Sequence, residues 1–252
     1  MPNSPVQDRV KAVAVMLSTL AVIALNIVAA TGRLNGVTPA EISAKYPTVI
    51  TPAGWAFSIW SSIYLGLLAF SIFQMLPSRI ASFSELRVPY LVSCLLNAVW
   101  ILLWHKFYIG LDAVVLLALV IVLLSISAKL RRSDSFVGAI LSKGVFGLYA
   151  GWVTVASLVN LVVYIVSTGL QMSVTDWDLI GIPVLAIAIA ASIFVRIRLR
   201  NFVYPLPIAW AAAGIGANQS GNTPIVVAAA ITCIGCLIIS GTVVTELKSS
   251  TT

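Results

Sequence analysis

Charged side chains are scarce in this sequence. They make up 9% of the 252 residues, whereas apolar side chains make up 60%. A soluble globular domain carries about 25% charged residues, so the composition excludes that class. The apolar runs are long enough to cross a hydrocarbon core of about 30 Å as helices, and they lack the alternating pattern of barrel strands. The sequence therefore predicts an all-α fold, a polytopic membrane helix bundle.

Histidine and cysteine are also rare, with one histidine and three cysteines. No histidine cluster, carboxylate pair or metal-ligand spacing is present, so the sequence offers no support for metal-dependent or acid–base catalysis. Cys233 and Cys236 share one face of an apolar run without a histidine or acid, which favours small core residues over a redox or metal site. His105, beside Lys106 at a predicted helix end, is typical of an interfacial residue rather than a haem ligand. We expect a binding protein more than an enzyme, and no required cofactor.

Eight apolar runs predict eight membrane spans. The seventh is short, and its two prolines, Pro205 and Pro207, stand in the first turn, where proline is tolerated. The predicted spans are 9–30, 55–76, 88–105, 109–129, 140–167, 179–197, 202–217 and 223–245.

The net charge of +7 reports topology, because the basic residues lie in short loops between apolar runs. No basic tract is long enough for a nucleic-acid footprint, so the expected partner is the lipid bilayer and not nucleic acid. With the N-terminus inside, inside segments hold 12 of the 15 basic residues, which predicts both termini on the cytoplasmic side of the cell membrane. The inside set is Arg9, Lys11, Arg79, Arg87, Lys129, Arg131, Arg132, Lys143, Arg196, Arg198, Arg200 and Lys248, and the outside set is Arg33, Lys45 and Lys106.

A polar segment at 171–178 divides the chain into a five-helix membrane domain, 1–170, and a three-helix extension, 171–252. We expect the extension to pack on the first domain and either cover a dimer face or build a second cavity. Glycines 144, 147 and 151 form a small-residue stripe that predicts close helix packing, internal or between subunits. In the long loop 31–54, Thr38 followed by Glu41 fits a capping box and predicts a short helix.

Three predicted spans each carry aromatic rings with a polar group on one helical face. The spacing i, i+3, i+7 places residues on one side of a helix. Buried asparagine is costly in a membrane unless hydrogen-bonded, so Asn97 and Asn160 should face protein or a cavity. The faces are Phe57, Trp60 and Tyr64; Asn97, Trp100 and Trp104; and Tyr149, Trp152, Ala156 and Asn160. Such surfaces suit a large planar, mostly apolar ligand with a few polar groups.

Each aromatic residue also has an alternative interpretation. The deeper Trp60, Trp100 and Trp152 fit pocket lining and plain core packing equally well. Trp and Tyr near span ends are typical of an interfacial belt, the interpretation we give to Trp55, Trp104, Trp177 and Tyr204. Asp112 opens a predicted helix, where a carboxylate is favourable, and a proton relay is the alternative.

Four motifs in these spans resemble the tryptophan-rich sensory protein family, also called TspO/MBR or translocator protein. They are Trp55-x-Phe57, Trp60-x-x-x-Tyr64, Leu96-Asn97-x-x-Trp100 and Tyr149-x-x-Trp152 followed by Leu158-Val159-Asn160. The resemblance covers about residues 9–168. It implies a five-helix core, often dimeric, so a homodimer is one expected assembly. It also implies a pocket under the first loop for porphyrins, haem, sterols or benzodiazepine-type ligands.

The expected function is a membrane binding or sensory protein for planar lipophiles such as tetrapyrroles, with transport or light-dependent porphyrin degradation as alternatives. The resemblance and the aromatic faces give the expected ligand-binding set Trp60, Tyr64, Asn97, Trp100, Tyr149, Trp152, Ala156 and Asn160. Between Phe57 and Trp60 the sequence is one residue shorter than the family pattern and lacks its proline. One residue fewer shifts Trp55 by about 100° around the helix relative to Trp60, unless Trp55 lies outside the helix. The last three spans have no counterpart in short family members.

Overall fold

The computed structural model describes residues 5–130 and 136–242, and within these ranges the regular structure is entirely helical. The helices are α1 (Pro5–Ala30), α2 (Pro39–Lys45), α3 (Ile59–Phe73), α4 (Arg87–His105), α5 (Ile109–Lys129), α6 (Phe136–Gly138), α7 (Val145–Ser167), α8 (Val174–Arg198), α9 (Pro205–Asn218) and α10 (Thr223–Gly241). A 3₁₀ turn, Gly54–Ser58, precedes α3, and a π-helical segment, Ala139–Gly144, joins α6 to α7. The all-α prediction is confirmed.

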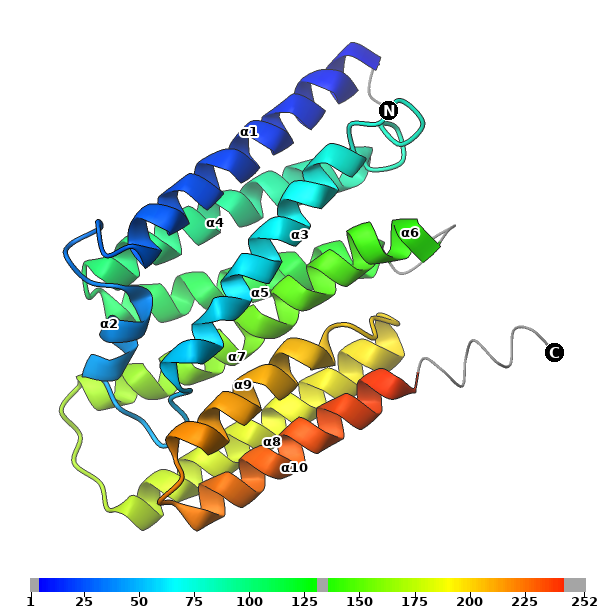
Figure 1. Cartoon of the computed structure of the whole chain (residues 1–252). Coiled ribbons are helices and arrows are strands. Elements are labelled where there is room, and N and C mark those ends of the chain that lie inside the picture. The colour runs from blue at the N-terminus through cyan, green and yellow to red at the C-terminus, as the bar shows by residue number, and fades with distance from the viewer. Residues whose placement is uncertain (1–4, 131–135, 243–252) are drawn as a thin grey trace.

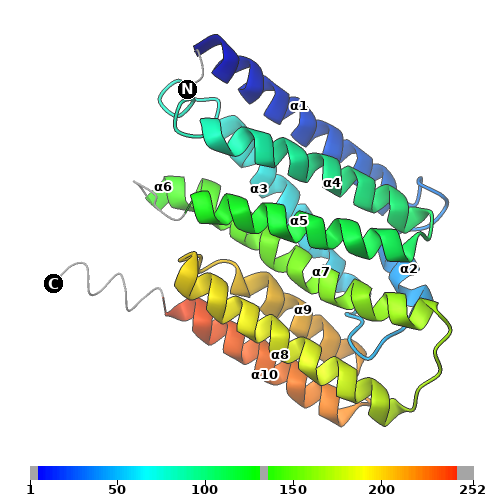
Figure 2. The same cartoon turned by 180° about the vertical axis from the view of Figure 1, so that it is seen from behind.

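The helices form one bundle with α1 at one outer edge and α8 and α10 at the other (Figure 1). Between these edges, α4 packs on α1 and α5, and α7 packs on α3, α5 and α9. Figure 2 shows the same order from behind. Because α7 contacts α3 and α5 on one side and α8 and α9 on the other, it joins the two parts of the chain.

Seven helical segments are long and apolar enough to cross a membrane. The seventh predicted span, 202–217, folds as α9, whose 14 residues extend only about 21 Å and fall short of that length. α9 packs against α7, α8 and α10, while Leu206 and Trp210 on its remaining face stay exposed. The protein is therefore an integral, multi-pass membrane protein with one short helix packed against its longer ones.

The chain starts and finishes its helical path at one end of the bundle. α1 begins and α10 ends there, and α5 and α8 also end there (Figure 1). Arg9 and Lys11 in the first turns of α1, Lys129 at the end of α5 and Arg196 in the last turn of α8 belong to the predicted inside set. The helix order thus keeps these basic residues at one end of the bundle.

Buried polar bonds hold α1 against α3 and α4. Arg87, 1% exposed, forms an ion pair with Asp8 at 2.7 Å and donates to Gln74 at 3.1 Å. About one turn further along α3 and α4, the hydroxyl of Thr19 on α1 lies 2.7 Å from that of Ser71 and 2.6 Å from that of Tyr90. Since polar groups are costly to bury unpaired, these bonds fix the rotation of α1 about its axis.

Two glycines on α7 let the segment before α9 lie against the helix backbone. A Cβ added to Gly151 would lie 2.2 Å from the carbonyl oxygen of Tyr204 and 2.6 Å from Cγ of Pro207. A Cβ added to Gly147 would lie 2.3 Å from Oδ1 of Asn201. The predicted small-residue stripe therefore serves an internal contact, and the C-terminal extension packs on the first five spans.

The long first loop is partly buried against the C-terminal extension. Asn218 donates to the carbonyl of Thr51 at 3.0 Å, and Gln219 donates to the carbonyl of Thr48 at 2.9 Å. The backbone N–H of Ala53 donates to the carbonyl of Gly214 at 3.0 Å. The C-terminal end of α9 thus fixes the part of the loop that leads into α3.

Candidate ligand-binding site

Trp60 is the centre of a cluster of aromatic rings from α3, α4 and α7. Its ring is stacked on Tyr64, with a centroid separation of 5.3 Å and an interplanar angle of 16°, and on Trp100, at 5.3 Å and 25°. Tyr149 and Trp152 meet Trp60 edge-on, at 5.9 and 6.3 Å. The i, i+3, i+7 spacing on each helix brings these rings together, and each such pair contributes about 0.5–1.5 kcal/mol beyond burial.

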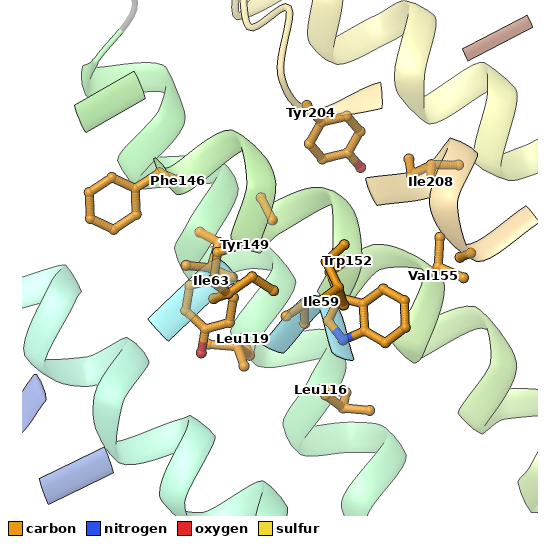
Figure 3. Close-up of a cluster of buried hydrophobic side chains, with 14 of the residues drawn as sticks. Ile59, Ile63, Leu116, Leu119, Phe146, Tyr149, Trp152, Val155, Tyr204 and Ile208 are labelled. Atoms are coloured by element: carbon orange, nitrogen blue, oxygen red, sulfur yellow. The ribbon is translucent and has the colours of Figure 1, made fainter. Parts of the chain in front are cut away.

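α7 contributes two of its aromatic rings, Tyr149 and Trp152, to this cluster. Figure 3 shows Tyr149 and Trp152 grouped with Ile59 of α3 and Leu116 of α5. Tyr204, just before α9, approaches α7 separately, and its hydroxyl lies 2.7 Å from that of Thr154. One helix thus separates the aromatic cluster from the C-terminal extension.

A buried chain of polar groups lies behind the rings. Asn26 of α1 donates to Oδ1 of Asn97 at 2.8 Å, and Nδ2 of Asn97 donates to the Tyr149 hydroxyl at 2.9 Å. Asn97 is fully buried. The chain joins α1, α4 and α7, so it fixes the helices that carry Trp100 and Trp152.

An outer pocket of about 370 Å³ lies between α1, the start of α2, α3 and α4. Trp60, Tyr64 and Trp100 form its aromatic wall, and Ile27 on α1 is 56% exposed at its rim. The full lining is Asn26, Ile27, Ala30, Thr38, Pro39, Ala40, Phe57, Ser58, Trp60, Ser61, Tyr64, Trp100 and Ile101. This volume lies at the low end of the range for small-molecule sites.

An inner pocket of about 40 Å³ lies deeper, toward α7. Phe57, Trp60 and Trp100 line both pockets and so stand between them. The full inner lining is Ser43, Pro52, Phe57, Trp60, Trp100, Trp104, Trp152, Val155, Ala156, Val159 and Asn160. The first loop covers both spaces, because Thr38 lines the outer pocket and Pro52 the inner one.

The helix α2 over the outer pocket begins with the predicted capping box. The Thr38 backbone N–H donates to Oε2 of Glu41 at 2.7 Å, and the Glu41 N–H donates to the Thr38 hydroxyl at 3.2 Å. The bond from the Thr38 backbone, reinforced by that from its side chain, lowers the pKa of Glu41. Trp104 adds a bond from Nε1 to the carbonyl of Pro39 at 3.2 Å, which ties α2 to α4.

Four polar atoms around the pockets have no hydrogen-bond partner among the described residues. They are the Tyr64 hydroxyl, Nε1 of Trp100, Nε1 of Trp152 and Oδ1 of Asn160. Trp100, Trp152 and Asn160 are only 5%, 4% and 7% exposed. An unsatisfied buried polar group costs about 1–3 kcal/mol, so hydrogen bonds from a ligand would offset a real penalty here.

Comparison with known proteins identifies the family. A family model described as TSPO-like protein matches residues 12–243, which includes both the first five spans and the C-terminal extension. The chain belongs to the TSPO-like protein family. No curated protein and no solved structure matches this TSPO-like chain significantly.

The structure of the TSPO-like protein brings six of the eight expected ligand-binding residues to the pockets. Tyr64 lines the outer pocket, Trp60 and Trp100 line both, and Trp152, Ala156 and Asn160 line the inner one. Asn97 and Tyr149 line neither and support the wall through the polar chain.

Several lining residues were not in the expected set. Phe57 was recognised on the aromatic face but not assigned to the site. Asn26 is an isolated asparagine within a long apolar run. Because a polar side chain is costly to bury in a membrane, its position could have indicated that it faces protein or a cavity. Ser43 lies on α2 and Pro52 in the irregular stretch that follows it. Both segments are too short for a periodicity that indicates which side chains point inward.

Trp55 lies outside the α-helix, in the 3₁₀ turn before α3, and lines neither pocket. Its ring packs edge-on against Trp210 of α9 at 4.8 Å. The interfacial assignment is wrong for Trp104 and Tyr204, which are 4% and 1% exposed, because protein covers both side chains. A position near a span end cannot distinguish lipid headgroups from a covering loop or helix.

The described lining residues of the two pockets of this TSPO-like protein carry no charge and include no histidine, cysteine or methionine. His105 and Asp112 are buried at the turn between α4 and α5 and line neither pocket. Tyr64 is therefore the only described lining side chain of a type that ligates haem iron.

Proposed function

We propose that this TSPO-like membrane protein binds planar, mostly apolar small molecules of the tetrapyrrole class and acts as a binding or sensory protein. The observation that carries the proposal is the stack of Tyr64, Trp60 and Trp100 along the wall of the outer pocket. Parallel rings at this spacing offer flat surfaces to a flat ligand, and an apolar wall favours its transfer from the bilayer.

The described lining fits ligand binding better than catalysis. It contains no charged residue that could carry a proton for coupled transport and no acid–base pair that could catalyse hydrolysis. Transport of a lipophile and light-dependent degradation differ from sensing in the fate of the ligand. An assay of the bound porphyrin distinguishes the three: sensing returns it intact, transport moves it across the bilayer, and degradation consumes it.

The test is a titration of the purified full chain with protoporphyrin IX and haem, followed by tryptophan quenching. We expect saturable binding that Trp100→Phe weakens about three- to tenfold, because Trp100 lines the outer pocket. Trp152→Phe should have a smaller effect, because Trp152 lines only the inner pocket. Trp177→Phe is the matched control, because Trp177 lies on α8 and lines neither pocket. Absence of saturable binding to both ligands would refute the proposal.

We also propose that both ends of the helical path face the cytoplasm, because the basic helix ends gather there. Reporter fusions active only on one side of the cell membrane test this orientation. Activity of an external reporter at either terminus would contradict it.

A further inference from the structure

The inner pocket is too small for the body of a planar ligand. Its volume is about 40 Å³, whereas a single water needs roughly 10–15 Å³. It has room for on the order of three water-sized groups. Because Phe57, Trp60 and Trp100 line both pockets, a ligand body in the outer pocket can extend a small terminal group past these rings into the inner one.

The unpartnered polar atoms at the inner pocket are of both kinds. Trp100 and Trp152 each hold an indole N–H, which can only donate. Asn160 holds a carbonyl oxygen, which can only accept, while its Nδ2 is used in a bond to the Ala156 carbonyl at 2.8 Å. All three side chains are more than nine-tenths buried.

The described lining of the inner pocket has no positively charged side chain that could pair with a charged ligand group. The described inner lining consists of apolar, aromatic, serine and asparagine side chains. An ionised carboxylate could accept from the indoles, but it has no proton to donate to Asn160 and no positive charge beside it. Burying an unpaired charge costs far more than burying a neutral polar group.

We propose that the inner pocket is a subsite for a neutral group that both accepts and donates hydrogen bonds, such as the hydroxyl or lactam end of a planar lipophile. This inference rests on the proposed function and narrows its ligand class. The group accepts from Trp100 or Trp152 and donates to Oδ1 of Asn160. Ligand carboxylates stay at the outer rim.

Three retinoids with one skeleton and different ends test the subsite. Tritiated retinol has a hydroxyl that donates and accepts, retinyl methyl ether only accepts, and retinoic acid is ionised at neutral pH. We expect the full chain, in a scintillation proximity assay, to bind retinol about tenfold more tightly than the ether. The acid should be weaker than retinol by at least about tenfold.

Two variants assign the hydrogen bonds. Asn160→Leu keeps a branched side chain and removes the acceptor, so it should weaken retinol about tenfold and leave the ether unchanged. Trp152→Phe removes a donor and should weaken both ligands in parallel. Ser157→Ala is the control on the same helix, since Ser157 is buried, bonds only to the Val153 carbonyl and lines neither pocket.

Other results overturn the inference in distinguishable ways. Equal affinity for retinol and retinoic acid would show that the inner pocket does not select a neutral donor–acceptor group. Equal loss of affinity for the alcohol and the ether in Asn160→Leu would show the same. Binding of protoporphyrin IX without any retinoid would also overturn it and leave the proposed function intact. Saturable binding of none of these compounds would refute the proposed function itself.

Discussion

Asn97 uses both ends of one amide to join three helices. Its oxygen accepts from Asn26 and its nitrogen donates to Tyr149, entirely out of contact with solvent. The same residue lines neither the outer nor the inner pocket. We therefore expect any contribution of Asn97 to ligand binding to be indirect, through the positions of the aromatic wall.

Asn97→Leu should destabilise the protein by about 1–3 kcal/mol, because it leaves the Tyr149 hydroxyl buried without its donor. Thermal unfolding in detergent measures the loss. Tyr149→Phe should cost less, since only one bond is lost. Tyr164→Phe is the reference on the same helix, because Tyr164 is 47% exposed. An unchanged melting temperature for Asn97→Leu would show that the polar chain does not stabilise the fold.

The sequence predicts which rings share a helical face, but it does not predict which faces meet. Periodicity placed Trp60 with Tyr64 and Tyr149 with Trp152, and the structure brings the two pairs into one cluster. Whether a polar atom there is satisfied depends on neighbours distant in sequence. The sequence alone could not show that both polar atoms of Asn97 are hydrogen-bonded while Oδ1 of Asn160 has no partner among the described residues.

At the scale of elements, α2 is a short helix that depends on its cap. Seven residues form few internal hydrogen bonds, so the bonds between Thr38 and Glu41 are a large part of what defines its start. These bonds stand at the outer pocket, because Thr38 and Pro39 line it.

Acidification should loosen α2. The pKa of Glu41 is lowered in the folded state, so its contribution is present above the ordinary glutamate pKa and is lost as pH falls through the folded value. Hydrogen-exchange protection of the α2 amides should therefore decline in acid. Glu41→Gln keeps a capping side chain and should remove the pH dependence. Equal pH dependence in both proteins would exclude this carboxylate as the cause.

The contact between α7 and the segment before α9 depends on glycine. Gly151→Ala should destabilise the protein by about 1–3 kcal/mol, because the added Cβ would meet the Tyr204 carbonyl at 2.2 Å, where backbone must move. Gly235→Ala in α10 is the matched control, since nothing lies within 4 Å of its Cβ. It should be neutral or slightly stabilising in a helix. Chemical unfolding compares them, and equal stability of the two variants would contradict the packing argument.

Helix positions were predictable from apolar runs, but the tertiary roles of α9 and the first loop were not. The expected span 202–217 carries a continuous apolar pattern, which does not reveal that most of α9 packs against α7, α8 and α10. Loop residues such as Thr48 and Thr51 are polar in sequence and buried in the fold, because they bond to the end of α9.

For the whole molecule, the absence of strong iron ligands from the described pocket linings sets an expectation for tetrapyrroles. Haem and metal-free protoporphyrin IX should bind within about threefold of each other, because stacking does not require the iron. Quenching titrations give both affinities, and the haem absorption spectrum reports any axial ligand. Much tighter haem binding that Tyr64→Phe abolishes would instead identify Tyr64 as an iron ligand.

The hydrogen bonds between α9 and the first loop bear on kinetics. The stretch 48–56 is attached to α9 by backbone and side-chain bonds, including one from Trp210 to the carbonyl of Ala56 at 2.9 Å. With that end fixed, the loop can move away from the pockets only by pivoting at its other half, around α2. The C-terminal helices touch neither pocket, yet they fix one half of the loop that covers both. We therefore expect changes in these helices to alter how quickly a bound molecule leaves.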